Sequence, residues 1–332
     1  MEDRNKEYWI KNKLNSWLIS QRNNPPSQGV ADNSTMKSLS NRCTRLHKRT
    51  IINHEKMKIY FYSVVLFVLI LAACDTKSTT SQKPNASGHT KFSKRKLVDL
   101  SHVFSDETIY WVTAKEFRLD TVYAGQTDKG FYYSANNFST AEHGGTHIDA
   151  PIHFAKNGQT VDEIPLEKLI GSAIKIDVSS KAFTNPDYLI SVEDFTDWEE
   201  NTGILIPDGS IVILQTGFSK YYPDKIKYLG TDDRGENAVK QLHFPGLSSE
   251  AAEWLVENRN IHAIGIDTPS IDYGQSEYFK SHVILLSNNI PAFENLTNLD
   301  KLPLNGFEII ALPMKIEGGS GAPLRIIAVL TD

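Results

Sequence analysis

The sequence predicts a single domain of mixed α/β (α+β) class over residues 96–332, and three observations indicate this class. Short runs rich in β-branched residues and bounded by turn residues recur along this stretch, as is typical of strands. One run has the apolar period of an amphipathic helix, and no internal repeat is visible. A length of about 240 residues suits one domain with a substantial core.

The strongest regular elements are five strands and one helix. The strands are predicted at residues 173–178, 210–215, 261–267, 307–312 and 324–330. The helix is predicted at residues 248–257, where Ser248 or Ser249 can cap the first turn and Ala251 and Leu255 share one face. Strands with few helices between them leave both α/β and α+β arrangements open.

Two further segments bear on the fold. The glycine-rich segment 317–323 predicts a hairpin connection between the last two strands, because it lacks the lysine and the following helix of a nucleotide-binding loop. Aromatic residues gather at 110–111 and 131–133. We expect strand alternation to bury some of them in the core, although they could also wall a pocket for a flat substrate.

Residues 57–74 have the pattern of a bacterial lipoprotein signal. Met57 and Lys58 precede sixteen uncharged residues that end in Leu-Ala-Ala-Cys at Cys74. The apolar run is shorter than the roughly 20 residues of a membrane span. Cleavage before Cys74 would place a lipid on that sulfur and anchor the protein to a bacterial membrane outside the cytoplasm, on the periplasmic side or at the cell surface. A membrane anchor or a buried helix is the alternative.

The segments around this signal differ in charge. Residues 1–56 carry eleven Lys and Arg against five Asp and Glu without apolar periodicity, and we interpret them as a disordered, non-native extension ahead of a start at Met57. A basic nucleic-acid-binding arm is the competing interpretation. Residues 75–95 are polar and predict a flexible tether.

The charge and cysteine content of the remainder exclude several functions. Residues 1–74 carry +7 of a total net charge of −5, so the rest carries −12, which argues against a nucleic-acid partner. Cys43 and Cys74 both precede the domain, so neither a disulfide nor a thiol nucleophile is expected within it.

One short segment carries the chemistry. Between residues 142 and 154 stand four polar candidates, namely His143, His147, Asp149 and His153. Neutral imidazoles and a carboxylate are preferred ligands of zinc and manganese, and three such groups leave positions open for substrate. The paired glycines 144 and 145 permit positive φ and disfavour a helix, while positions 147 and 149 share one side of an extended chain. The alternative is a surface loop that holds three histidines without a metal.

The segment resembles the signature of the metal-dependent cyclase family, which includes bacterial kynurenine formamidases and isatin hydrolases. The family pattern His-x-Gly-Thr-His-x-Asp-x-Pro-x-His matches from His143 to His153. A second family element, a histidine followed twelve residues later by a glutamate, matches His282 and Glu294. Resemblance extends from about Leu97 to the C-terminus.

The resemblance implies a swivelling β/β/α fold and a site. His143, His147 and Asp149 would bind one metal ion, and His282 and Glu294 a second one bridged by Asp149, although some relatives use one ion. His153 matches the family's general acid/base. The metal would be zinc or manganese, and no organic cofactor is expected.

The function implied is hydrolysis of an amide C–N bond. The substrate would be an N-formyl aryl amine such as N-formylkynurenine, or a cyclic amide such as isatin. The partner is then a small aromatic amide, and a homodimer is also considered. A lactone or other carbonyl hydrolase or cyclase on the same scaffold is the first rival. A lipid-anchored metal- or ligand-binding protein without turnover is the second, and His153 argues against it, because a binding site needs no group held back from the metal.

A few further side chains are candidates for supporting roles. Asp267, at the end of a predicted strand, is either a turn cap or a support for the site. His243 is a candidate for the lining of a pocket, and Glu142 for contact with a metal ligand. His262 is expected in the core.

Overall fold

The computed structural model describes residues 95–330. The predicted extension at 1–56, the signal at 57–74 and the tether up to residue 94 lie outside the described residues. Within residues 95–330, no helix has the length and apolar character needed to cross a membrane.

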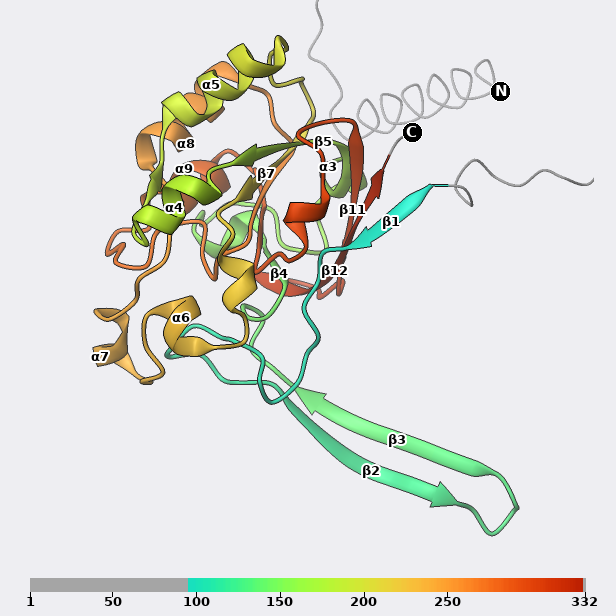
Figure 1. Cartoon of the computed structure of the whole chain (residues 1–332). Coiled ribbons are helices and arrows are strands. Elements are labelled where there is room, and N and C mark those ends of the chain that lie inside the picture. Colours follow the sequence, from blue (N-terminus) through green and yellow to red (C-terminus); the bar gives the residue numbers. More distant parts are fainter. Residues whose placement is uncertain (1–94, 331–332) are drawn as a thin grey trace, which may run out of the picture. The chain divides into compact units, whose positions relative to one another are not determined.

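An eight-stranded sheet forms the centre of the domain (Figure 1). Its strands lie in the order β1 (Lys96–Asp99), β12 (Gly321–Leu330), β11 (Phe307–Pro313), β5 (Ile170–Asp177), β7 (Ile211–Gln215), β9 (Ala263–Ile266), β10 (Ala292–Glu294) and β4 (His147–Asp149). The neighbours from β5 to β10 are parallel, whereas β11, β12 and β4 run antiparallel to their partners.

The sheet closes into a barrel because β12 pairs twice on one side. Its C-terminal part pairs with β1, and its first residues, Gly321 to Pro323, pair with β4. Since β4 also pairs with β10, seven strands form a ring from β12 round to β4. Closure removes the sheet edge that a short strand such as β4 would otherwise expose.

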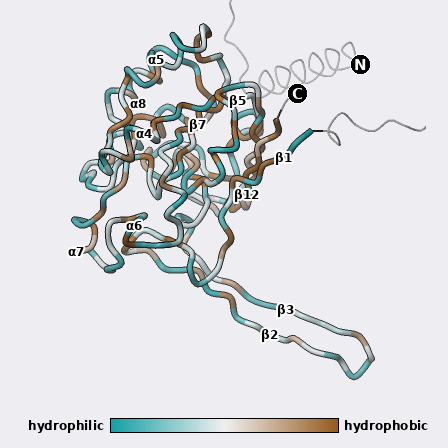
Figure 2. The backbone as a smooth tube through the Cα atoms, in the orientation of Figure 1, coloured by the Kyte–Doolittle hydropathy of each residue, from teal (hydrophilic) through white to brown (hydrophobic). Residues whose placement is uncertain are grey.

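Alternation along the central strands separates two apolar cores. In β7, Ile211 and Ile213 belong to a core with β4, β11 and β12, whereas Val212 and Leu214 face the helices. Every residue of β7 is buried, as expected for a strand covered on both faces. Figure 2 shows the hydrophobic residues of β7.

Three helices cover the outer face of the parallel strands, namely α5 (Val192–Thr202), α8 (Ser249–Asn258) and α9 (Lys280–Ser287). The side chain of Ser248 accepts a hydrogen bond from the backbone N–H of Ala251, which caps α8 as predicted. Ala251 and Leu255 on its buried face pack into the core between helices and sheet. The helix therefore forms where an apolar stripe and a cap coincide.

Shorter elements connect these layers. They are the helices α3 (Leu166–Leu169), α4 (Ser179–Thr184), α6 (Lys225–Leu229) and α7 (Glu236–Val239), the 3-10 turns η2 (Pro151–His153), η3 (Phe218–Tyr221) and η4 (Leu299–Lys301), and the strand pair β6 (Leu189–Ile190) and β8 (Gly246–Leu247). A third apolar core lies around α6 and α7.

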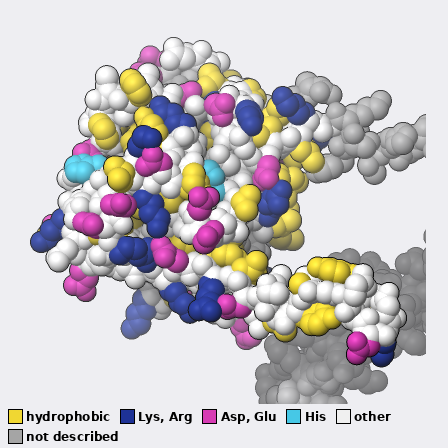
Figure 3. Space-filling model, turned by 60° about the horizontal axis from the view of Figure 1, so that its bottom comes forward, with side chains coloured by type: hydrophobic (Ala, Val, Ile, Leu, Met, Phe, Trp, Pro, Cys, Tyr) yellow, Lys and Arg dark blue, Asp and Glu magenta, His cyan; other side chains and the backbone are white. Residues whose placement is uncertain are grey.

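A long hairpin projects from the body (Figure 1) and comprises β2 (Arg118–Gln126) and β3 (Tyr132–Ser139). The expectation that some of the aromatic residues at 110–111 and 131–133 fill the core holds for Tyr110, which is 2% exposed, but not for Phe131, Tyr132 and Tyr133, which are half or more exposed on this hairpin. Figure 3 shows apolar side chains along it. Side chains do alternate along the two strands, but no other part of residues 95–330 packs against the hairpin.

The mixed α/β prediction is confirmed, and all five predicted strands and the predicted helix are present with their ends shifted by a few residues. The segment 317–323 joins β11 to β12 as the predicted hairpin connection. The sequence did not reveal the short strand β10 or the helix α9, which carry Glu294 and His282.

Candidate metal centre

Two short antiparallel strands place three of the predicted ligands on one surface. In β4, His147 and Asp149 point to the same side, while Ile148 between them is buried in the barrel core. In β10, Phe293 lies opposite Ile148, and Glu294 lies opposite His147. Cross-strand partners share a face, so two carboxylates and an imidazole gather on the outer side of the barrel.

The paired glycines bring His143 to this surface for two reasons. Both have the positive φ that the sequence predicts, +158° at Gly144 and +55° at Gly145. Both also allow a close approach, since a Cβ on Gly144 would lie 2.0 Å from the ring of Tyr110 and a Cβ on Gly145 would lie 2.8 Å from the ring of Phe104. A larger residue at either position would therefore clash with an aromatic ring.

Asp149 is the centre of the cluster. Its Oδ1 lies 2.6 Å from His143 Nδ1 and 3.2 Å from His147 Nε2. Its Oδ2 lies 3.0 Å from His282 Nε2, which α9 contributes. Glu294 lies 3.4 Å from His147 Nε2 and 3.2 Å from His282 Nε2. Both parts of the predicted ligand set, which are 151 residues apart at the extremes, His143 and Glu294, thus meet in one place.

In His147 and His282, a contact of Nδ1 orients the ring so that Nε2 points toward Asp149 and Glu294. His282 Nδ1 lies 2.6 Å from Asp272 Oδ2. His147 Nδ1 lies 2.9 Å from the carbonyl oxygen of Gly145, to which it can only donate. Such contacts fix the tautomer and leave Nε2 of both rings as free electron-pair donors, as in metal sites where a carboxylate or carbonyl orients the ligand.

His143 is held by the loop before β12. Its Nε2 lies 2.9 Å from Ser320 Oγ, and that hydroxyl lies 2.6 Å from Glu142, to which it donates. The backbone N–H of Ser320 also donates to Glu142. A Cβ at Gly321 would lie 2.5 Å from the ring of His143, so the glycine-rich loop packs directly on this ligand. Glu142 supports the site as predicted, through Ser320.

The electrostatics of the cluster indicate a place for positive charge. Burial alone would raise the pKa of Asp149, but contacts with three imidazoles hold that pKa well below its usual value. Burial and the neighbouring Asp149 carboxylate raise the pKa of Glu294. Burial opposes the charged form of His282, yet its carboxylate neighbours raise its pKa well above the usual value. Two buried carboxylates this close are costly unless cations compensate them.

These donors fit a divalent metal. Ligand atoms of His147, Asp149 and Glu294 lie within 4.8 Å of one another, and so do those of His143, Asp149 and His153. Imidazole nitrogen with carboxylate oxygen is a donor set that suits zinc and manganese. Asp149 belongs to both groups, which is what a carboxylate shared by two ions requires.

His153 lies beside the cluster on the turn η2, which Pro151 begins. Its ring stacks on that of His143 with centroids 3.8 Å apart and an interplanar angle of 20°. Burial lowers the pKa of His153 to about 4, so the imidazole is neutral near pH 7 and can accept a proton.

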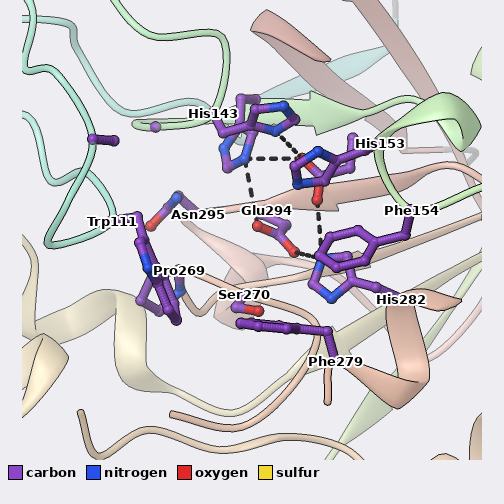
Figure 4. A pocket seen from close by; sticks show the side chains of 14 residues that line it. Trp111, His143, His153, Phe154, Pro269, Ser270, Phe279, His282, Glu294 and Asn295 are labelled. Carbon is purple, nitrogen blue, oxygen red and sulfur yellow. Dashed lines mark hydrogen bonds and ion pairs between the residues drawn. The ribbon is translucent and has the colours of Figure 1, made fainter. Parts of the chain in front are cut away.

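The cluster lines one wall of a cavity of about 280 Å³. The other wall is largely apolar and aromatic (Figure 4). Phe279 lies between Trp111, 6.0 Å away by ring centroids, and Phe154, 5.4 Å away. Pro269 closes the side near Trp111. The volume is near the lower limit of the roughly 300–1,000 Å³ typical of small-molecule sites.

Sequence reasoning misjudged or missed several residues. His243 does not line this cavity, because it is exposed and pairs with Asp187 at 2.8 Å. Asp267 accepts hydrogen bonds from the backbone N–H groups of Thr216 and Gly217, so it caps the loop after β7 and not its own turn. The contact of Asp272 with His282 was not predicted, although Asp272 ends the run from Gly265 to Asp272 that resembles a family element.

Asp272→Asn should weaken metal binding while leaving the fold intact. The amide has the shape of the carboxylate but loses the negative charge that orients His282. Loss of such an outer contact typically costs about 10–100-fold in metal affinity. Competition with a chelator measures this affinity, and circular dichroism checks the fold. An unchanged affinity for zinc would show that Asp272 only organises the start of α9.

Comparisons with known proteins agree with this geometry. The Cyclase family model matches residues 98–273. The chain is 32% identical over 210 residues to isatin hydrolase of Roseibium aggregatum, covering 60% of this chain and 76% of the relative. It is 27% identical over 237 residues to kynurenine formamidase of Salinibacter ruber, covering 71% and 97%.

A solved structure shares the fold. The crystal structure of an isatin hydrolase bound to the product analogue thioisatinate superposes with a TM-score of 0.66 at 27% identity, covering 72% of this chain and 94% of that one. The mixed α/β domain with a barrel core is the cyclase-like arrangement that the motifs implied. Family model, relatives and fold together show that this chain belongs to the Cyclase family.

Proposed function

We propose that this protein is a metal-dependent hydrolase that cleaves the amide C–N bond of a small aromatic amide. The observation that carries the proposal is the cavity, in which three imidazoles and two carboxylates face an aromatic wall. A flat ring can lie against Trp111, Phe154 and Phe279 while its carbonyl group reaches the donors. The same position places the scissile bond beside His153.

His143, His147, Asp149, His282 and Glu294 would hold one or two ions of zinc or manganese. Such a metal polarises a carbonyl and lowers the pKa of water toward 7. The neutral His153 can accept the proton of the attacking water and return it to the leaving nitrogen. The aromatic wall orients the ring and excludes bulk water, so that the amide is presented in one direction.

Two considerations favour a cyclic amide such as isatin over an N-formyl aryl amine such as N-formylkynurenine. The identity to the isatin hydrolase exceeds that to the formamidase, and the solved relative binds a product analogue of isatin. An extracytoplasmic location would point the same way, because tryptophan breakdown is normally cytoplasmic.

A substrate screen tests the proposal. The protein loaded with zinc or with manganese is supplied with isatin, N-formylkynurenine and an aromatic lactone, and ring opening or deformylation is followed by absorbance. We expect turnover of isatin to be fastest. Preference for the lactone would move the function to ester chemistry, and tight binding of all three without turnover would identify a binding protein.

We further propose that the protein is anchored outside the cytoplasm through a lipid on Cys74. The support is the complete signal pattern from Met57 to Cys74, the polar segment after it, and the acidic charge of the remainder, which provides no affinity of its own for an anionic membrane.

Cys74→Ser should abolish this maturation and leave catalysis intact. Expressed from Met57 in a bacterium, the natural sequence is expected to be cleaved before Cys74, labelled by fatty acid and recovered in membranes, because the sulfur is the only acceptor at that position. Mass spectrometry and radiolabelled palmitate measure both steps. If the serine variant is processed to the same mass and still labelled, the anchor lies elsewhere.

A further inference from the structure

Asn295 follows the candidate ligand Glu294 and lines the same cavity. Successive residues of a strand point to opposite faces, so a continued β10 would turn Asn295 away from the side of Glu294. The backbone at Asn295 is instead left-handed, with φ +53°, and it carries the side chain to the cavity. Asparagine is one of the few residues other than glycine that adopt this conformation readily. Two consecutive polar side chains therefore face the cavity.

Tyr228 fixes the orientation of the Asn295 amide. Its hydroxyl donates to Oδ1 of Asn295 at 2.9 Å, closer than the 3.2 Å to the carbonyl oxygen of Asp267. Tyr228 is fully buried, and burial raises the pKa of this phenol well above its usual value, so the hydroxyl keeps its hydrogen. The backbone of Asn295 is held as well, by hydrogen bonds with Thr268 and Thr146. With Oδ1 occupied, the Nδ2 group is left to face the cavity.

The Nδ2 group of Asn295 has two hydrogens to donate and no acceptor among residues 95–330. Asn295 is 1% exposed, so this amide lies away from bulk solvent. A buried donor without a partner costs free energy, and a glycine would adopt the same backbone conformation without burying an amide. The arrangement therefore favours a ligand atom with a lone pair as the partner of Nδ2.

The position of Asn295 indicates which ligand atom this is. Figure 4 shows Asn295 on the side of Trp111, away from His153 and Phe154. In the proposed function, on which this inference rests, the metal centre and His153 serve the scissile amide. Consecutive Cα atoms are about 3.8 Å apart, so an oxygen bound by Asn295 lies next to a group held at Glu294. An oxygen on the carbon beside the scissile carbonyl is the substrate group that fits this place.

We propose that Asn295 is a specificity-determining donor, whose Nδ2 group binds a second oxygen that the substrate carries on the carbon next to the scissile carbonyl. A ketone oxygen accepts a hydrogen bond, whereas a methylene group at the same position leaves the buried donor unpaired. Sites built to bind an oxygen reject the analogue that lacks it for this reason. The site therefore prefers aromatic amides of the α-keto class to simple aromatic amides.

Two acids that differ only in this group test the proposal on the full-length chain loaded with zinc. Benzoylformate has a ketone beside its carboxylate, and phenylacetate has a methylene group there, while ring and charge are the same. Titration calorimetry gives the ratio of the Kd of phenylacetate to the Kd of benzoylformate and requires no turnover. We expect a ratio of about 10 or more in the natural chain, which is the worth of one buried hydrogen bond.

Four variants identify the group that produces this ratio. Asn295→Gly removes the amide and accepts the same φ, and Asn295→Asp keeps the shape without the donor, so both should bring the ratio close to one. Tyr228→Phe should lower the ratio in part, because the amide can then turn its oxygen to the cavity. Asn298→Gly is the matched control, since Asn298 has φ +59° and does not line the cavity, and it should keep the natural ratio. Metal content and circular dichroism are measured for each variant.

A ratio that is unchanged in both Asn295 variants would overturn the proposal, because the metal itself would then distinguish the two acids. Loss of the ratio in Ser270→Ala alone would assign the ketone to the hydroxyl of Ser270, which also lines the cavity. Turnover of isatin with either of these results would leave the proposed hydrolase function standing. A ratio that depends on Asn295 in a protein that hydrolyses no amide would support the donor and remove the function.

Discussion

Asp149→Ala is expected to abolish both metal binding and turnover. Asp149 contacts the imidazoles of His143, His147 and His282, and it belongs to both groups of candidate ligands. Without the Asp149 carboxylate, the three imidazoles lose the negative charge that they share. Loss of a metal that contributes several kcal/mol to catalysis corresponds to a fall in kcat of at least about 10³-fold.

Metal content by atomic emission and initial rates with isatin measure the two effects separately. Asp208→Ala, an exposed aspartate outside the cavity, is the matched control and should leave both unchanged. Asp149→Asn separates charge from shape, and we expect it to lose metal as well, because an amide is a weaker ligand. Full metal content in the alanine variant would show that the ion does not depend on Asp149.

His153→Ala should reduce turnover by about 10²–10⁴-fold, the usual range for a lost general acid/base, while the metal content stays the same. The neutral imidazole lies beside the donors, and the pKa of about 4 that burial produces leaves it free to take a proton. Rates together with metal analysis measure the result. His243→Ala changes an exposed histidine that does not line the cavity and serves as the control.

A different result would reassign His153. Its ring nitrogen lies within 4.8 Å of ligand atoms of His143 and Asp149. If the His153→Ala protein loses metal in proportion to activity, His153 is a ligand of the ion and no proton shuttle. Retained metal with retained turnover would remove it from the mechanism altogether.

The ligand motif could be predicted because its geometry is local. From His143 to His153 the chain has eleven residues, and alternation in β4 together with the tight turn at Gly145 suffices to bring the side chains near one another. The strand β7 and the helix α8 could also be predicted from the sequence, because a continuous apolar run, an apolar period and a cap each lie within a short window.

The hydrogen-bond partners of the candidate ligands could not be predicted from the sequence. Ser320 meets His143 only because β12 closes the barrel against β4, and Asp272 meets His282 only because α9 packs over the outer face of the barrel. No pattern marks Ser320 as a partner of a ligand, and its contact with His143 spans 177 residues. Asp272 ends a run that resembles a family element, but its contact with His282 depends on the placement of α9.

The sequence by itself determined the kind of chemistry, a metal site of imidazoles and carboxylates in a mixed α/β domain, because residue types and short spacings decide which ligands are available. Only the tertiary structure decided which nitrogen of each histidine faces inward, and that the aromatic residues 131–133 lie outside the core on the hairpin β2–β3. Alternation shows which side chains share a face, but burial depends on whether a distant part of the protein, or a second molecule, packs against that face.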